Sequence, residues 1–233
     1  MREIVLDTET TGFEPSEGHR IVEIGAVELF NHLPTGRTYH QYINPERSMP
    51  KEAFEVHGLG DDFLRDKPVF KAIGQAFLDF IGDAKLVIHN AAFDMKFLNA
   101  ELEWAGLPGL PWARAVDTLM IARQKFPGAP ASLDALCRRF GVDNSAREKH
   151  GALLDSEILA EVYLELVGGR QPDLVLSPAA TAPVNGQARA TDEGWRPRPR
   201  PQPLTPRITE EEASAHAAFV AKLGDAAIWK KRA

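Results

Sequence analysis

Near its N-terminus the chain reads Ile4-Val5-Leu6-Asp7-Thr8-Glu9-Thr10-Thr11-Gly12. The three apolar residues predict a short buried strand, and Thr10-Thr11-Gly12 predicts the turn that follows it. Side chains two residues apart in a strand point the same way, so Asp7 and Glu9 present two carboxylates to one point. Two like charges this close repel each other unless something neutralises them. We therefore expect a hard divalent cation bound by oxygens here, in preference to a solvated strand end or a helix cap.

Apolar spacing beyond this strand predicts one α/β domain that spans residues 1–169. Buried or alternating runs predict further strands over residues 20–30, 38–43, 86–88 and 115–116. Helical spacing predicts helices over residues 69–81 and 91–104, then three more after the last strand, of which the final one covers 151–167. Gly168-Gly169 is expected to end that helix. Strands that come first and then mix with helices are typical of a mixed sheet flanked by helices.

A third acid follows the strand expected at residues 86–88, in the segment His89-Asn90-Ala91-Ala92-Phe93-Asp94. Taken alone, Asp94 is typical of an acid that stabilises a helix N-terminus. Asn90 is expected to be the cap of that helix. His89 alone is more typical of a hydrogen-bonded structural histidine than of a catalyst.

The fourth acid lies in the segment His150-Gly151-Ala152-Leu153-Leu154-Asp155. Five residues on an ideal helix span about 140°, so His150 and Asp155 cannot share a face within one helix. Both can face one site if His150 lies on the loop before the helix and Asp155 lies inside it. A surface histidine and an exposed helix acid are the alternative, but the apolar neighbours of Asp155 favour an inward orientation.

Together these segments supply four carboxylates and one histidine, and in this order they resemble the DEDD exonucleases of the histidine subtype. The chain is most similar to the proofreading exonucleases of bacterial replicative DNA polymerases. The resemblance covers nearly all of residues 2–167 and is carried by residues 4–12, 21–27, 56–58, 86–94, 132–137 and 150–155. It implies a ribonuclease-H-like fold, with Asp7, Glu9, Asp94 and Asp155 as metal ligands and His150 as the general base.

The implied activity is 3′–5′ exonuclease hydrolysis of 3′-terminal nucleotides of DNA by two divalent metal ions, in proofreading for the replicative polymerase. Carboxylate and water ligands suit Mg²⁺, and Mn²⁺ should substitute. The substrate contacts that we expect come from Asp7, Glu9, Thr10, His57 and Asp155. An exonuclease that trims RNA 3′ ends is the alternative within the same superfamily, and a catalytically inactive interaction module is the alternative from another class.

Composition limits the other classes. The net charge of −6 argues against a protein that coats nucleic acid through a broad basic surface. The single cysteine, Cys137, excludes a disulfide within the chain and a cysteine-rich zinc site. No apolar run reaches the roughly 18 residues of a membrane span, and the N-terminus does not resemble a signal peptide. We therefore expect a cytoplasmic protein.

The C-terminal part differs in composition. Residues 170–207 contain eight of the 17 prolines and predict an extended, flexible linker. Thr209 and Glu212 form a capping-box pattern that predicts a short helix in a tail of residues 208–233.

Two features of this part indicate partners. Residues 171–176, with Gln171, Leu174 and Leu176, resemble the short peptide by which bacterial proteins bind the β sliding clamp, although its terminal aromatic is missing. The tail resembles one that binds the polymerase α subunit, and Val220, Leu223 and Trp229 are its expected anchors. The resemblance also suggests the small θ subunit, or an equivalent, as a partner.

Overall fold

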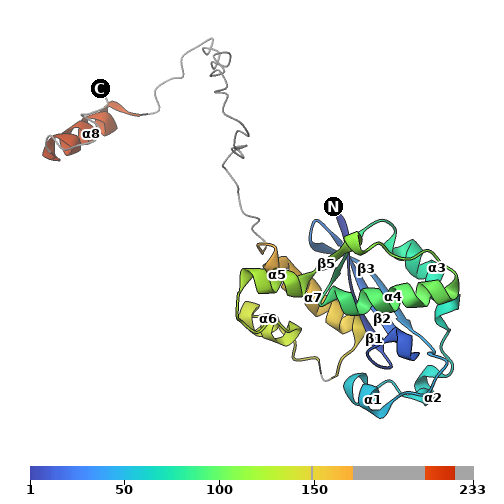
Figure 1. Cartoon of the computed structure of the whole chain (residues 1–233). Coiled ribbons are helices and arrows are strands. Elements are labelled where there is room, and N and C mark those ends of the chain that lie inside the picture. Colours follow the sequence, from blue (N-terminus) through green and yellow to red (C-terminus); the bar gives the residue numbers. More distant parts are fainter. Residues whose placement is uncertain (148, 170–207, 224–233) are drawn as a thin grey trace, which may run out of the picture. The chain divides into compact units, whose positions relative to one another are not determined.

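The computed structural model describes residues 1–147, 149–169 and 208–223. The part of the chain up to residue 169 is built on one five-stranded sheet, which Figure 1 shows among the helices. The strands lie in the order β3-β2-β1-β4-β5. Their bounds are β1 Arg2–Thr10, β2 Ile21–Phe30, β3 Leu33–Tyr42, β4 Lys85–Ile88 and β5 Ala115–Asp117. Strands β1, β2 and β3 are antiparallel neighbours, while β4 pairs parallel with β1 and β5 pairs parallel with β4. The predicted mixed sheet is therefore confirmed.

Helices cover both faces of this sheet. They are α1 Lys51–His57, α2 Asp61–Leu64, α3 Phe70–Ile81, α4 Ala91–Ala105, α5 Thr118–Lys125, α6 Leu133–Phe140 and α7 Ala152–Leu166, with 3-10 turns η1 Pro15–Glu17 and η2 Trp112–Arg114. The predicted helices at residues 69–81, 91–104 and 151–167 are confirmed to within a residue or so. The short helices α1 and α2 were not expected. None of the helices in the described ranges is long and apolar enough to cross a membrane.

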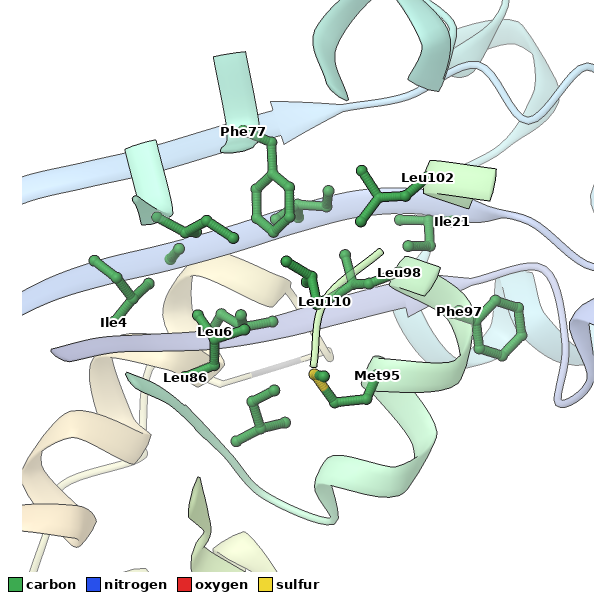
Figure 2. Close-up of a cluster of buried hydrophobic side chains, with 14 of the residues drawn as sticks. Ile4, Leu6, Ile21, Phe77, Leu86, Met95, Phe97, Leu98, Leu102 and Leu110 are labelled. Atoms are coloured by element: carbon green, nitrogen blue, oxygen red, sulfur yellow. The ribbon is translucent and has the colours of Figure 1, made fainter. Parts of the chain in front are cut away.

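Strand β1 separates two parts of the core because its side chains alternate between the faces of the sheet. Ile4 and Leu6 pack with α3 and α4 in the larger cluster, which Figure 2 shows. Val5 faces the other way, where it packs with Leu159 and Tyr163 of α7. By the same alternation Asp7 and Glu9 lie on the face that α7 covers, and Thr8 turns toward α4. The strand thus delivers both carboxylates to the helix that carries Asp155.

A close approach of α7 to β2 brings Asp155 to these carboxylates. Gly25 pairs with Asp7 across the two strands. A Cβ added at Gly25 would lie 2.1 Å from the Leu153 amide nitrogen and 2.2 Å from the Ala152 carbonyl carbon. The Ser156 hydroxyl also donates to the Gly25 carbonyl oxygen over 2.9 Å. Only glycine therefore lets the first turn of α7 rest directly on β2.

The last helix of the described residues lies near the C-terminus. Helix α8, Glu210–Lys222, begins with the predicted capping box: Thr209 Oγ1 accepts from the Glu212 amide, and the Glu212 carboxylate accepts from the Thr209 amide over 2.8 Å. Val220 is half-buried and Leu223, the C-cap residue, is exposed. The expectations for the linker 170–207, including Gln171, Leu174 and Leu176, and for Trp229 lie outside the described residues.

We expect Gly25→Ala to lower the free energy of unfolding by about 1–3 kcal/mol or more, the usual range for overpacking against atoms that cannot move aside. Gly151→Ala is the matched control, because a Cβ there meets open space, so it should cost only the roughly 0.5–1 kcal/mol by which glycine exceeds alanine at an N-cap. Denaturant unfolding of both variants measures the difference. Equal stabilities for the two variants would contradict the proposed role of Gly25.

Candidate active site

The five residues singled out in the sequence gather in one cavity of about 490 Å³. Asp7 and Glu9 come from the end of β1, and Asp94 comes from the first turn of α4. Asp155 comes from the first turn of α7, and His150 from the segment before it. Segments that are more than 140 residues apart in the sequence therefore meet at one edge of the sheet.

The arrangement of His150 and Asp155 is the one that their spacing required. Gly151 is the N-cap of α7, so His150 lies on the preceding segment and Asp155 lies within the helix. His150 Nδ1 is 3.2 Å from Asp155 Oδ2. Glu9, His150 and Asp155 each bring one potential ligand atom within 4.8 Å of the others. Both residues therefore line the same cavity.

Asp94 does more than stabilise the N-terminus of α4, because it also contacts β1. Its carboxylate is buried, and Oδ1 accepts a hydrogen bond from the Thr8 hydroxyl over 2.7 Å. Thr8 points to the α4 face of the sheet, so the residue between Asp7 and Glu9 holds the third carboxylate in place. This contact between β1 and α4 ties the two acidic motifs together.

The expectations for the neighbouring residues have different outcomes. Asn90 does occupy the N-cap position of α4, but its side chain makes no capping hydrogen bond, so that expectation is wrong in its mechanism. Its backbone is left-handed, with φ of 66°, and its amide donates to the Asp117 carboxylate over 3.3 Å. His89 is confirmed as a hydrogen-bonded histidine: its Nδ1 lies 2.9 Å from the Thr118 hydroxyl, and burial lowers its pKa.

Burial and mutual repulsion set the protonation of the carboxyl groups. Burial, followed by the charges of Asp94, Glu9 and Asp155, raises the pKa of Asp7 well above its ordinary value. Burial likewise raises the pKa of Glu9 to about 8 and that of Asp94 to about 7. Without a cation, burial and the neighbouring negative charges therefore disfavour the ionised form of these groups. A cluster of carboxylate oxygens that repel one another in this way fits hard divalent cations such as Mg²⁺ or Mn²⁺.

Asp155 is the exception because it has a cationic partner. Burial alone would raise its pKa, but the neighbouring side chains of His150 and Arg147 outweigh burial and lower it. Arg147 Nε and Nη2 donate to the two oxygens of Asp155 over 2.5 and 2.6 Å. In the sequence Arg147 lies only in the short polar segment before α7. Its inward position follows from contacts between distant segments, which no local pattern reveals.

A second cavity of about 460 Å³ adjoins the first, because Thr8, Glu9 and Phe93 line both. Thr10 and His57, which were predicted to contact substrate, line this second cavity. His57 is buried, and its Nδ1 accepts from the Leu59 amide over 3.0 Å. Burial also lowers the pKa of His57, so the ring is neutral at pH 7 and carries its proton on Nε2.

Known proteins share both the sequence and the fold. The Exonuclease (RNase_T) family matches residues 4–163. A DNA polymerase III subunit epsilon from Rickettsia conorii is 49% identical over 233 residues, which cover 96% of each chain. The Escherichia coli K12 protein of that name is 43% identical over 242 residues, which cover 98% of this chain and 97% of the relative. The nuclease domain of 3′hExo, a DEDDh family member bound to rAMP, shares the fold, with a TM-score of 0.61 and 22% identity over 71% of this chain and 91% of that one.

The raised pKa values make metal-free stability depend on pH. A carboxyl group with a raised folded-state pKa contributes stability that is present at low pH and is lost as pH rises through that pKa. In EDTA we therefore expect the melting temperature to fall between pH 5 and pH 8. Asp7→Asn should flatten this decline and raise the melting temperature at pH 8 by about 2–4 °C, which corresponds to about 1 kcal/mol in a protein of this size. The exposed Asp62→Asn serves as the control, and a pH dependence in Asp7→Asn as steep as that of the wild type would contradict this explanation.

Proposed function

The chain belongs to the exonuclease family of the DNA polymerase III epsilon subunits and is a 3′–5′ exonuclease, and on that premise we propose how it acts and on what. It hydrolyses 3′-terminal nucleotides of DNA and proofreads for the replicative DNA polymerase III. The observation that carries this proposal is the meeting of four carboxylates and His150 in one cavity beside a second, partly apolar one.

Asp7, Glu9, Asp94 and Asp155 would hold two divalent cations, Mg²⁺ by preference with Mn²⁺ as a substitute. When bound, such cations lower the pKa of the attacking water and offset the charge on the leaving oxygen. Asp7 lies among the other three acids, whose charges all act on its carboxyl group. Its carboxylate would therefore hold the cations together with the other three acids.

His150 acts as the general base. It is exposed at the cavity, where water and substrate reach it. When Nδ1–H donates to Asp155 Oδ2, at the 3.2 Å separation observed, Nε2 keeps a free lone pair. Nε2 then takes the proton of the attacking water, and Asp155 holds the ring in the required tautomer.

The terminal nucleotide occupies the second cavity. Asp7, Glu9 and Asp155 face its phosphate from the first cavity, while Thr10 and His57 contact the nucleoside from the second. A paired terminus must unpair before it reaches this cavity, so mismatched ends should react faster.

The C-terminal part supplies the partners. We assign polymerase α-subunit binding to the tail through Val220, Leu223 and Trp229, and β-clamp binding to residues 171–176. The θ subunit, or an equivalent, is assigned to the same cytoplasmic complex. In this arrangement the linker raises the effective concentration of the nuclease near the primer end.

The activity is tested with a 3′-mismatched DNA primer and a matched RNA, each with and without Mg²⁺. We expect nucleoside 5′-monophosphate release from the mismatched DNA only when Mg²⁺ is present, and slower release from RNA. Faster release from RNA would support an RNA-trimming enzyme instead. No release from either would support an inactive interaction module.

We expect His150→Ala to lower turnover by about 10²-fold or more, the usual scale for loss of a general base. Because His150 also lies within ligand distance of Glu9 and Asp155, calorimetric titration with Mn²⁺ separates the two roles. Loss of the base alone leaves Mn²⁺ affinity unchanged. A large fall in affinity would make His150 a metal ligand, and unchanged turnover would place the base elsewhere.

We expect a chain that ends near residue 170 to keep its activity on short single strands, because the proposed ligands and the base all lie within residues 1–169. It should lose tight association with the α subunit, and Trp229→Ala should weaken that association by about 2 kcal/mol or more, as is common for aromatic anchors. Gel filtration and calorimetry with the α subunit measure both. If the truncated chain binds as tightly as the full chain, the nuclease domain makes the main contact.

A further inference from the structure

Arg147 lies outside any helix or strand, yet its guanidinium makes polar contacts with three other side chains. Its guanidinium holds both oxygens of Asp155, and Nη1 donates to Asp134 Oδ1 over 2.8 Å. The Arg147 side chain is only 10% exposed, and that of Asp155 only 4%. A two-pronged ion pair between buried partners is among the stronger polar contacts in proteins. The catalytic roles proposed above do not use it.

We propose that Arg147 is a positioning residue that occupies the place of a cation at Asp155 in the metal-free enzyme and leaves Asp155 when a metal ion binds there. This inference rests on the proposed role of Asp155 as a metal ligand. Both carboxylate oxygens of Asp155 accept short hydrogen bonds from Arg147. A metal ion that binds to Asp155 must therefore compete with the guanidinium, and this competition weakens apparent metal affinity.

Asp134 provides the second position for Arg147. Its side chain is about half exposed, lies in the same cavity and is held by Asn144 Nδ2 over 3.0 Å. Arg147 therefore remains attached through Nη1 after it leaves Asp155. A tethered guanidinium stays at high effective concentration and returns when the metal leaves. In both states the segment between α6 and α7 keeps an anchor beside the active site.

The same movement governs His150. Arg147 Nη2 lies 2.7 Å from His150 Nδ1. A guanidinium can only donate, so while Arg147 is bonded to the neutral ring, Nδ1 accepts, the ring proton is on Nε2, and Nδ1 cannot also donate to Asp155. In that tautomer Nε2 cannot take a proton from water. When Arg147 leaves, Nδ1 can carry the ring proton and donate it to Asp155. Nε2 then has a free lone pair, so metal binding also produces the tautomer that acts as the base.

The test uses the full-length chain in calorimetric titrations with Mn²⁺ and in thermal melts with EDTA. Arg147→Met removes the charge and keeps most of the side-chain volume. We expect its Mn²⁺ dissociation constant to be at least about tenfold lower than that of the wild type, equivalent to about 1.4 kcal/mol. Its metal-free melting temperature should fall by several degrees, because Asp155 loses its partner, and saturating Mn²⁺ should restore most of the loss.

Two further variants separate competition from a general effect of charge. Arg123 lines the same cavity but has no ion pair within the described residues, so Arg123→Met should change Mn²⁺ affinity much less. Asp134→Asn removes the tether and should tighten Mn²⁺ binding in the same direction as Arg147→Met. Equal effects of Arg147→Met and Arg123→Met would overturn the inference, as would unchanged Mn²⁺ affinity in Arg147→Met. If the wild type binds no Mn²⁺, the proposed metal site fails and the inference fails with it.

Discussion

The fold places four carboxylates in one cavity, and their mutual repulsion is the constraint on which the rest of the site depends. Protons, the Arg147 guanidinium or divalent cations can each offset it. In the metal-free chain the first two do so: burial and repulsion raise the pKa values of Asp7 and Glu9, burial raises that of Asp94, and Arg147 neutralises Asp155. Phosphodiester hydrolysis needs cations at the same place. The four carboxylates thus already lie together in the absence of metal, but the site cannot catalyse hydrolysis until the cations bind.

Three features of the fold hold the carboxylates close enough for this repulsion to matter. Strand β1 sends Asp7 and Glu9 to the face covered by α7, and the missing side chain of Gly25 lets that helix rest on β2. Thr8, on the opposite face, holds Asp94 of α4. The apolar clusters on the two sides of the sheet make this framework rigid. The alternation of side chains along β1 therefore determines both the packing of the core and the geometry of the active site.

Local sequence patterns predicted the parts of the site that local physics determines. Alternation in β1 placed Asp7 and Glu9 together, and the helix period placed His150 before α7. The first half of β3 was missed because Leu33 to Thr38 is exposed and has no apolar alternation. Helices α1 and α2 are too short to show a period. The left-handed backbone of Asn90 and the inward position of Arg147 depend on contacts with distant segments, which a single sequence does not reveal.

Anomalous scattering from crystals of the full-length chain soaked in Mn²⁺ tests the central claim most directly. The account predicts two manganese peaks about 4 Å apart, the spacing of two-metal sites. They should lie among Asp7, Glu9, Asp94 and Asp155, with the Arg147 guanidinium moved off Asp155 and still bound to Asp134. An absence of peaks in this cavity would contradict the account. So would manganese bound by Asp155 while Arg147 keeps both of its present hydrogen bonds to that carboxylate.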